Sequence, residues 1–421
     1  MAIINIDSDA TLLATSSIND GDTLLFKTGT TFNASNITAD LLTKNNITVG
    51  YYGTGAKPII SGAVTRLGNT FTQDAPNGVW FVDLGHTKGG CISEDGVMLT
   101  FTSWIGNAST PTALANTLAS MVTGSFMIDA KTNPANHRMY IKTAGNNPVG
   151  KTYIIAETKY GFVTSSTAKT GLGISDLDFQ WLSVGAITVG KRTNSTLNNI
   201  GCYKMGGNYL LTTAGNAVIY YGGGLGFEHG VYNATVSNCI VEDAFDSAYS
   251  PQVFVSNESI DGVNFTNNIA RRCGLAAMEI AVSSSTVVNS TVKNVVVDDL
   301  VCEGMGTGWS GLKANGYGDA VVLMNSASAG NCTITNNTIK NVSVNVAQNI
   351  IKTNKPSGTN RFLNISGTGI VTSLVNELST TTQDINQYYS VSDSSGHTFA
   401  GKTTWFETPG IALPTRTILS R

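Results

Sequence analysis

A short pattern of alternating apolar and polar positions returns through the second half of the chain. It reads apolar, any, Asn or Asp, any, any, apolar or small, and it is clearest at 174–179 (ISDLDF), 236–241 (VSNCIV) and 265–270 (FTNNIA). Each copy is too short for a helix, and period-two alternation with β-branched residues predicts a strand. Because the copies return at intervals typical of solenoids, the pattern predicts coils of β-strand stacked on one another.

The third position of each copy is expected at a bend of the coil, because Asn and Asp tolerate the left-handed backbone conformation that tight bends require. In stacked coils these residues form a ladder. Its expected members are Asp176, Asn199, Asn238, Asn267, Asn294, Asn336 and Asn364. The cysteines in or beside the copies are expected to be small buried residues and not a disulfide framework; they are Cys202, Cys239, Cys273, Cys302 and Cys332.

The pattern divides the chain into four parts. Residues 1–60 are interpreted as an N-terminal cap and first coils, and residues 161–375 as the central β-helix. Residues 61–160 lack the Asn ladder and are expected to form a β-rich insertion packed on the solenoid, with one short helix from Thr112 and a strand from Met139. Because an open solenoid end exposes strand edges, residues 376–421 are expected to cap that end or to mediate oligomerisation.

Composition narrows the function classes. Only 13% of the 421 residues are charged and the formal net charge is −3, which argues against electrostatic binding of nucleic acid. No run of about 18 apolar residues occurs, so no membrane insertion is expected. The first residues lack the basic-then-apolar layout of a secretion signal. The chain contains no CxxC pair, calcium loop or phosphate-binding loop, so neither a metal nor a cofactor is predicted.

Two regions of the sequence resemble a known superfamily. The openings GDTLLFKTGTTF and YYGTGAKPIISG, and the central stretches GFEHGVYNATVSNCIVEDAFDSAYSPQ and NFTNNIARRCGLAAMEIA, resemble right-handed parallel β-helix proteins of the pectate-lyase-like superfamily. The resemblance covers about residues 1–60 and 160–370 and is closest to phage tailspike depolymerases. It implies an all-β, right-handed parallel β-helix that binds a bacterial capsular or other surface polysaccharide. It also implies a homotrimer on the virion tail, with an extracellular or cell-surface location as the alternative.

The superfamily includes hydrolases, lyases and esterases, so the reaction has to be argued from the residues. Asp246 and Glu279 are the leading pair for acid and base or nucleophile, because each lies among small or apolar neighbours, which favour a protonated acid. Glycoside hydrolysis uses one protonated and one ionised carboxyl group. Glu228 and Asp243 are the reserve acids. Carboxyl groups on adjacent coils, about 5 Å apart, would suit retention, and a separation of two coils, about 10 Å, would suit inversion.

The candidate substrate-binding residues surround these acids in the sequence. They are His229, Tyr249, Gln252, Arg271, Arg272, Glu303, Trp309 and Lys313. Asp243, Asp246, Glu279, Arg271, Arg272, Glu303 and Lys313 are expected to share one face. The two arginines are consecutive, so on a strand they are expected to face opposite sides, and one is then free to meet an acidic sugar. The alternative for each residue is an ordinary turn hydrogen bond, salt bridge or core position.

Hydrolysis of glycosidic bonds in a surface polysaccharide is the favoured function. The alternative reactions are β-elimination, using His229, the arginines and Lys313, and O-deacetylation, using Ser247, His229 and Asp246. No GxSxG motif supports the deacetylase. A non-catalytic adhesin is the alternative from another class, and it requires no pair of acids.

Overall fold

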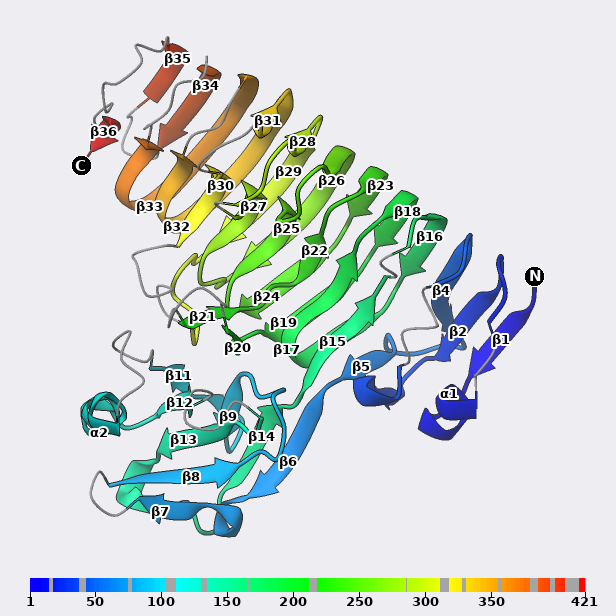
Figure 1. The fold of residues 1–421 in the computed structure, drawn as a ribbon, viewed down its shortest axis with the longest axis vertical. Coiled ribbons are helices and arrows are strands. Elements are labelled where there is room, and N and C mark those ends of the chain that lie inside the picture. The colour runs from blue at the N-terminus through cyan, green and yellow to red at the C-terminus, as the bar shows by residue number, and fades with distance from the viewer. Residues whose placement is uncertain are drawn as a thin grey trace.

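The computed structural model winds most of the chain into a stack of parallel strands, from the blue N-terminal end to the red C-terminal end in Figure 1. It describes residues 1–14, 18–37, 43–74, 78–102, 111–129, 135–164, 167–211, 218–284, 286–310, 318–327, 331–354, 358–378, 385–393, 398–405 and 416–420. No helix in these ranges is long and apolar enough to cross a membrane.

Two successive coils show how the stack is built. In one coil the strands are β18 (Arg192–Asn198), β19 (Gly201–Met205) and β22 (Leu225–Phe227), and in the next they are β23 (Val231–Ser237), β24 (Ile240–Ala244) and β25 (Ser247–Val253). β18 pairs with β23, β19 with β24 and β22 with β25, each in parallel. Three parallel sheets therefore run along the stack, and the predicted parallel β-helix is confirmed.

The remaining coils extend the same three sheets. The first sheet also contains β1 (Ile3–Ile6), β2 (Thr23–Lys27), β4 (Ile47–Tyr52), β16 (Lys169–Ser175), β28 (Thr291–Lys293) and β31 (Thr333–Thr335). The second sheet contains β3 (Thr31–Asn33) and β5 (Ile59–Ser61), and the third contains β15 (Thr158–Val163), β27 (Ala276–Val282) and β30 (Asp319–Asn325). Longer strands cross a bend between two sheets; they are β17 (Asp178–Val189), β26 (Ser259–Arg271), β29 (Val296–Glu303), β32 (Asn337–Asn354) and β33 (Gly358–Leu378).

Apolar ladders fill the interior of the coil. One ladder joins Leu197, Val236, Phe265, Val297 and Ile339 on successive coils, and all five side chains are fully buried. The five cysteines predicted to lie inside the coil are buried, which confirms that prediction, and Cys91 in the insertion is buried as well. Burial of such aligned apolar side chains is the main stabilising contribution that stacking adds.

The predicted polar ladder exists, but two of its members were assigned to the wrong bend. All seven predicted residues have a positive φ, between 51° and 60°, which confirms the left-handed conformation. The strand register, however, aligns Asp176, Asn199, Asn238, Asn267, Asp299, Asn341 and Asn364 in one column. Asn294 and Asn336 belong to a second left-handed column, with Asn46, Gly171, Asn194, Asn233 and Gly262.

The two columns are easily confused because both bends impose the same requirement. Each bend needs one residue in the left-handed region, and each follows a strand with the same alternation. Asn294 and Asn336 therefore match the six-residue pattern locally, although the pattern belongs to the neighbouring bend. Only the pairing of whole strands distinguishes the two columns.

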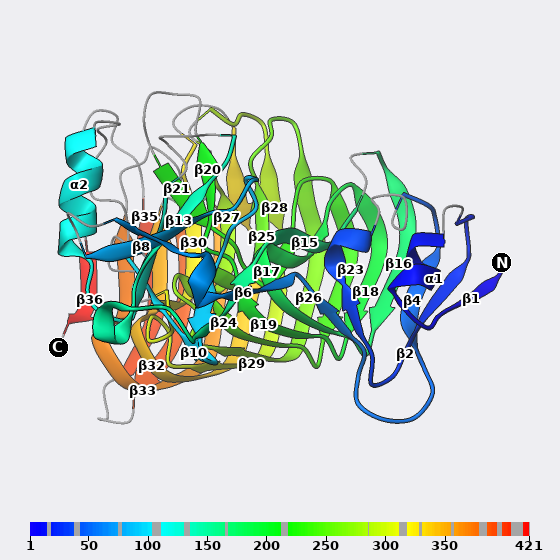
Figure 2. The ribbon, with the colours of Figure 1, turned by 90° about the horizontal axis from the view of Figure 1, so that it is seen from below.

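The insertion consists of two antiparallel-rich sheets beside the coils. One sheet contains β6 (Ala63–Leu67), β9 (Ile92–Glu94), β10 (Val97–Met98) and β14 (Thr152–Ala156). The other contains β7 (Thr72–Asp74), β8 (Val79–Asp83), β11 (Thr100–Phe101), β12 (Ser125–Asp129) and β13 (Arg138–Lys142). The expected helix is α2 (Pro111–Ser120). Figure 2, which views the molecule from below, shows the insertion in front of the stacked coils.

The insertion is joined to the solenoid by an apolar cluster and by backbone hydrogen bonds. Trp181, Phe245 and Trp309 of the solenoid pack in one buried cluster with insertion side chains. The rings of Phe101 and Phe245 meet edge to face, with centroids 5.0 Å apart. The Cys91 backbone N–H donates to the Gly206 carbonyl oxygen at 3.0 Å. These contacts hold the two sheets of the insertion against the coils.

The two ends of the stack differ from its middle. At the C-terminal end, β34 (Ile385–Asp393) continues in parallel with β33, whereas β35 (Thr398–Trp405) and β36 (Arg416–Ser420) pair antiparallel to β34 and β33. At the N-terminal end, the short helix α1 (Asp9–Ala14), which the sequence pattern did not indicate, follows β1. A hairpin of β20 (Asn208–Leu211) and β21 (Val218–Tyr221) projects from the coils between β19 and β22.

Candidate active site

Acidic and polar side chains gather on the outward face of the third sheet. On β27, Met278 and Ile280 point into the core cluster, so Glu279 between them points outward. On β25, the consecutive residues Ala248 and Tyr249 both belong to the core, which leaves Ser247 and Gln252 on the outside. We call Glu228, Ser247, Gln252 and Glu279 the outer face.

Glu279 is held by two donors from the preceding coil. Its side chain is only 4% exposed. Its Oε2 accepts a hydrogen bond from Ser247 Oγ at 2.8 Å and another from Gln252 Nε2 at 2.5 Å. Ser283 Oγ donates to Gln252 Oε1 at 3.2 Å, which orients the Gln252 amide so that its NH₂ group faces the carboxylate. Because an ionised carboxylate only accepts, this arrangement suits the ionised form of Glu279.

Glu228 lies in a different electrostatic environment. It directly follows β22, and its backbone N–H donates to the Val189 carbonyl oxygen at 2.7 Å. Burial raises the pKa of its carboxyl group from 4.5 to about 7. Tyr160 and Tyr221, joined by a side-chain hydrogen bond, lie close enough for the Glu228 charge to raise the pKa of both phenols, in addition to the effect of their own burial. Among the described residues, no hydrogen bond or ion pair to the Glu228 side chain occurs, so nothing compensates the cost of burying its charge.

Two coil steps separate Glu228 from Glu279. Phe227 pairs with Pro251 on the next coil, so Glu228 lies beside Gln252, and Gln252 and Glu279 belong to adjacent coils. Gln252 pairs with Ala281, two residues beyond Glu279, so two coil steps of roughly 4.8 Å and two residues along the strand place the two backbone positions about 12 Å apart. Inverting glycosidases keep their two carboxyl groups about 6.5–9.5 Å apart, whereas retaining enzymes keep them about 5 Å apart. This spacing leaves room between the two side chains for the water molecule that inversion requires.

Along the strand direction, Asp246 and Glu228 lie on opposite sides of Glu279. It precedes β25 at a bend, where its backbone N–H donates to the Gly222 carbonyl oxygen at 2.9 Å and its own carbonyl oxygen accepts from the Leu275 N–H at 3.1 Å. The next residue, Ser247, provides the hydroxyl that bonds Glu279. The acid pair chosen from the sequence therefore lies on adjacent coils, but not at the same position along the strands.

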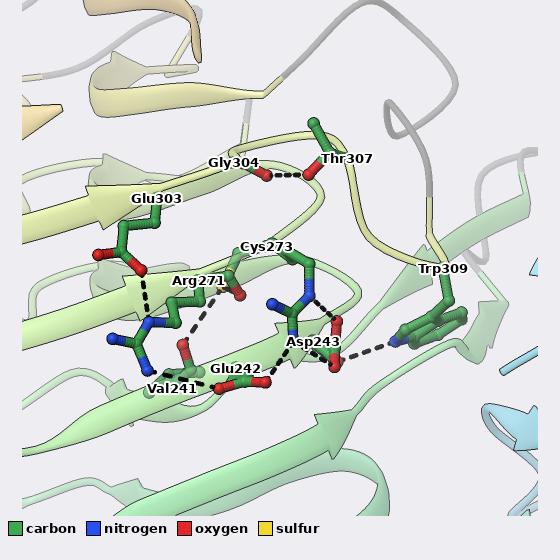
Figure 3. Close-up of polar contacts among 10 residues, drawn as sticks. Val241, Glu242, Asp243, Arg271, Cys273, Glu303, Gly304, Thr307 and Trp309 are labelled. Atoms are coloured by element: carbon green, nitrogen blue, oxygen red, sulfur yellow. Dashed lines mark hydrogen bonds and ion pairs between the residues drawn. The ribbon is translucent and has the colours of Figure 1, made fainter. Parts of the chain in front are cut away.

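The remaining charged candidates form a separate group on the second sheet, drawn in Figure 3. Glu242, Arg271 and Glu303 pair across three successive coils. Arg271 Nε donates to Glu303 Oε2 at 2.5 Å, and an Arg271 NH1–Glu242 Oε2 ion pair measures 3.8 Å. Arg272 binds Asp243 through two nitrogens, at 2.8 and 3.0 Å, and also binds Glu242. We call these five residues the corner network.

The corner network corrects two expectations. Arg271 and Arg272 do not face opposite sides, because both bind Glu242. Arg271 ends β26, and Arg272 has φ of 50°, so strand alternation no longer applies at this position. The expected single charged face is also divided, because Asp243, Arg271, Arg272 and Glu303 belong to the second sheet, whereas Glu279 belongs to the third.

Two further candidates, Tyr249 and Trp309, take the alternative role of core positions. Tyr249 has no exposed surface, and its hydroxyl shares one proton between the carbonyl oxygens of Cys239, at 2.9 Å, and Ile269, at 2.8 Å, so we remove it from the candidate sugar ligands. Trp309 packs in the cluster between insertion and solenoid, and its indole N–H donates to the Asp243 carbonyl oxygen at 2.8 Å. Lys313 lies outside the described residues.

Sequence reasoning missed the residues that give Glu228 its environment. Tyr160 comes from β15, far from Glu228 in the chain, and no local motif connects the two. Gln252 was expected to contact sugar, but in the structure it positions Glu279. In the described part of the chain, no group of three or more His, Cys, Asp or Glu side chains is arranged to hold a metal ion.

No family model matches the chain, and no curated protein sequence matches it. Solved structures of similar shape include the XylC–xylose complex, with a TM-score of 0.40 and 11% identity over 89% of this chain and 67% of that one. An alginate lyase from Paenibacillus sp. str. FPU-7 has a TM-score of 0.35 and 10% identity over 93% and 99%. The tailspike protein of E. coli bacteriophage HK620, in complex with a pentasaccharide, has a TM-score of 0.30 and 8% identity over 92% of this chain and 57% of its own. Similarity at this level carries no argument about what this chain does.

Proposed function

We propose that this protein binds a bacterial surface polysaccharide and cleaves its glycosidic bonds by hydrolysis with inversion. The observation that supports this most is the contrast between two glutamates on one face. Glu228 has a pKa raised by burial to about 7, so much of it is protonated at neutral pH. Glu279, two coils away, accepts two hydrogen bonds that suit its ionised form.

In this mechanism each glutamate has one task. Glu228 donates its proton to the glycosidic oxygen as the bond from that oxygen to the anomeric carbon breaks. A water molecule attacks the anomeric carbon from the opposite face, and Glu279 accepts the proton that the water loses. Asp246 is the second candidate for the base, and comparison of the Asp246→Asn and Glu279→Gln variants separates the two roles.

The decisive experiment is product analysis on a panel of capsular and other acidic polysaccharides. We expect new reducing ends without absorbance at 235 nm, and NMR of the first product should show the inverted anomer. Absorbance at 235 nm would instead demonstrate β-elimination, and release of acetate alone would demonstrate an esterase. Binding without any product would identify an adhesin, and each of these three outcomes would overturn the hydrolase.

A tailspike-like homotrimer that recognises the host cell from the virion tail is part of the same proposal, and it rests on the sequence resemblance. Sedimentation at the mass of three chains, about 130 kDa from the 44.2 kDa protomer, is the expected result. A monomer across micromolar concentrations would contradict the trimer without affecting the proposed hydrolysis.

A further inference from the structure

Phe254 is an exposed aromatic side chain close to Glu228. It follows β25 directly and is 42% exposed. Its ring meets the His229 ring edge to face, with centroids 5.3 Å apart and an interplanar angle of 82°. His229 is the next residue after Glu228. The contact with His229 therefore places the Phe254 ring near the proposed acid. A single exposed apolar side chain is ordinary, but one held in place beside an acid requires a reason.

An ion pair lies beside the His229 turn. Lys191 Nζ and Glu258 Oε1 form an ion pair of 3.1 Å, and the Lys191 backbone N–H donates to the His229 carbonyl oxygen at 2.9 Å. Gly230 lies between them with φ of 74°, and a Cβ atom there would come within 3.2 Å of both Glu258 and Lys191. Glycine therefore allows the ion pair to pack closely around the His229 turn.

We propose that Phe254, supported by His229 and flanked by the Lys191–Glu258 pair, forms a sugar-binding subsite next to Glu228. The exposed face of an aromatic ring packs on the apolar face of a pyranose, while adjacent charged groups exchange hydrogen bonds with its hydroxyls. The ligand is a neutral or weakly charged hexose unit of the polysaccharide, because Lys191 and Glu258 already neutralise each other. The proposal rests on the proposed function for its substrate, since the subsite would hold the sugar beside the bond that Glu228 protonates.

If the subsite exists, loss of the Phe254 ring should weaken polysaccharide binding whether or not the polysaccharide is cleaved. The Phe254→Ala change should weaken binding of the cleaved polysaccharide at least about tenfold, as loss of a central aromatic contact does at other binding sites. It should raise KM with little change in kcat, because the ring does not touch the reacting atoms. Phe254→Trp should restore binding. Tyr51→Ala, which removes an equally exposed ring from β4 far along the stack, is the matched control and should bind as the wild type does.

The experiment is affinity electrophoresis of the full chain in gels that contain each polysaccharide of the panel, together with kinetics on those that are cleaved. The Glu228→Gln background allows binding to be measured without turnover. Retarded migration that Phe254→Ala abolishes, and Tyr51→Ala does not, supports the subsite even if no polymer is cleaved. Unchanged binding and KM in Phe254→Ala would overturn the subsite and leave the hydrolase intact. No retardation of the wild type by any polymer would overturn both.

Discussion

Glu228 and Glu242 lie on the same solenoid, yet their surroundings differ completely. Glu242 belongs to the corner network, where Arg271 and Arg272 form ion pairs with it and with Asp243 and Glu303. Glu228 lies on the outer face among Tyr160 and Tyr221, where burial shifts its pKa to about 7. A carboxylate held by two arginines is engaged in contacts that a sugar would first have to displace. The comparison indicates that the cluster with the most charges holds coils together, and that the less charged face is the one equipped for chemistry.

The largest effect should come from removing the proposed acid. The Glu228→Gln change should lower kcat by about 10²–10⁴-fold, because the amide cannot donate a proton to the leaving oxygen. The measurement is the rate of reducing-end release. Asp298→Asn, which alters a partly exposed ion pair with Lys340, is the matched control and should retain full activity. If Glu242→Gln abolished turnover and Glu228→Gln did not, the assignment of the two clusters would be reversed.

The second effect concerns how stability depends on pH. The folded-state pKa of Glu228 is raised from 4.5 to about 7, so the folded protein holds a proton that the unfolded chain releases between these values. Stability therefore falls as pH rises from about 4.5 to 7, by on the order of 3 kcal/mol for this group. Glu228→Gln does not titrate, so it should exceed the wild type in stability at pH 8 by more than it does at pH 4. Chemical denaturation at the two pH values measures this, and an equal difference at both would contradict the raised pKa.

The third effect tests whether the corner network is structural. Arg272→Ala leaves Glu242 and the half-buried Asp243 without their shared partner, and it should destabilise the protein by about 1–2 kcal/mol, between the values of exposed and buried pairs. The substitution should leave kcat unchanged. Urea denaturation and kinetics on the same sample measure both quantities. A large loss of kcat with unchanged stability would move Arg272 into the substrate-binding site.

The smallest effect belongs to the outermost member of the network. Glu303 is 40% exposed and binds Arg271 alone among the five residues, so Glu303→Gln should cost no more than about 0.5 kcal/mol. The cost should shrink further at 1 M salt, where exposed charges are screened. Thermal denaturation at low and high salt gives the answer. A cost that matched that of Arg272→Ala would mean that the network acts as one cooperative unit.

Local chemistry determined much of this protein. The alternation of apolar and polar residues predicted strands, and their recurrence predicted the β-helix, because each coil buries one face only by stacking on another. The left-handed conformation of Asn199 or Asn267 follows from side-chain size and hydrogen bonding at a bend, both of which are local properties. The burial of Cys202 and its counterparts likewise follows from their place in the apolar alternation.

Tertiary pairing decided what local chemistry left open. Asn294 and Asn336 fit the repeat equally well at either bend, and only strand register assigned them to the second column. Tyr249 lies in the core because two consecutive residues of β25, Ala248 and Tyr249, face inward. This departure from strand alternation cannot be predicted from the local sequence. Asp243 and Asp246 are three residues apart, yet the bend between them places one in the corner network and the other beside the outer face. The environment of Glu228 depends on Tyr160 from a distant strand. Sequence therefore determined the fold and the kinds of residue available, and the stacking of coils decided which of them lie together.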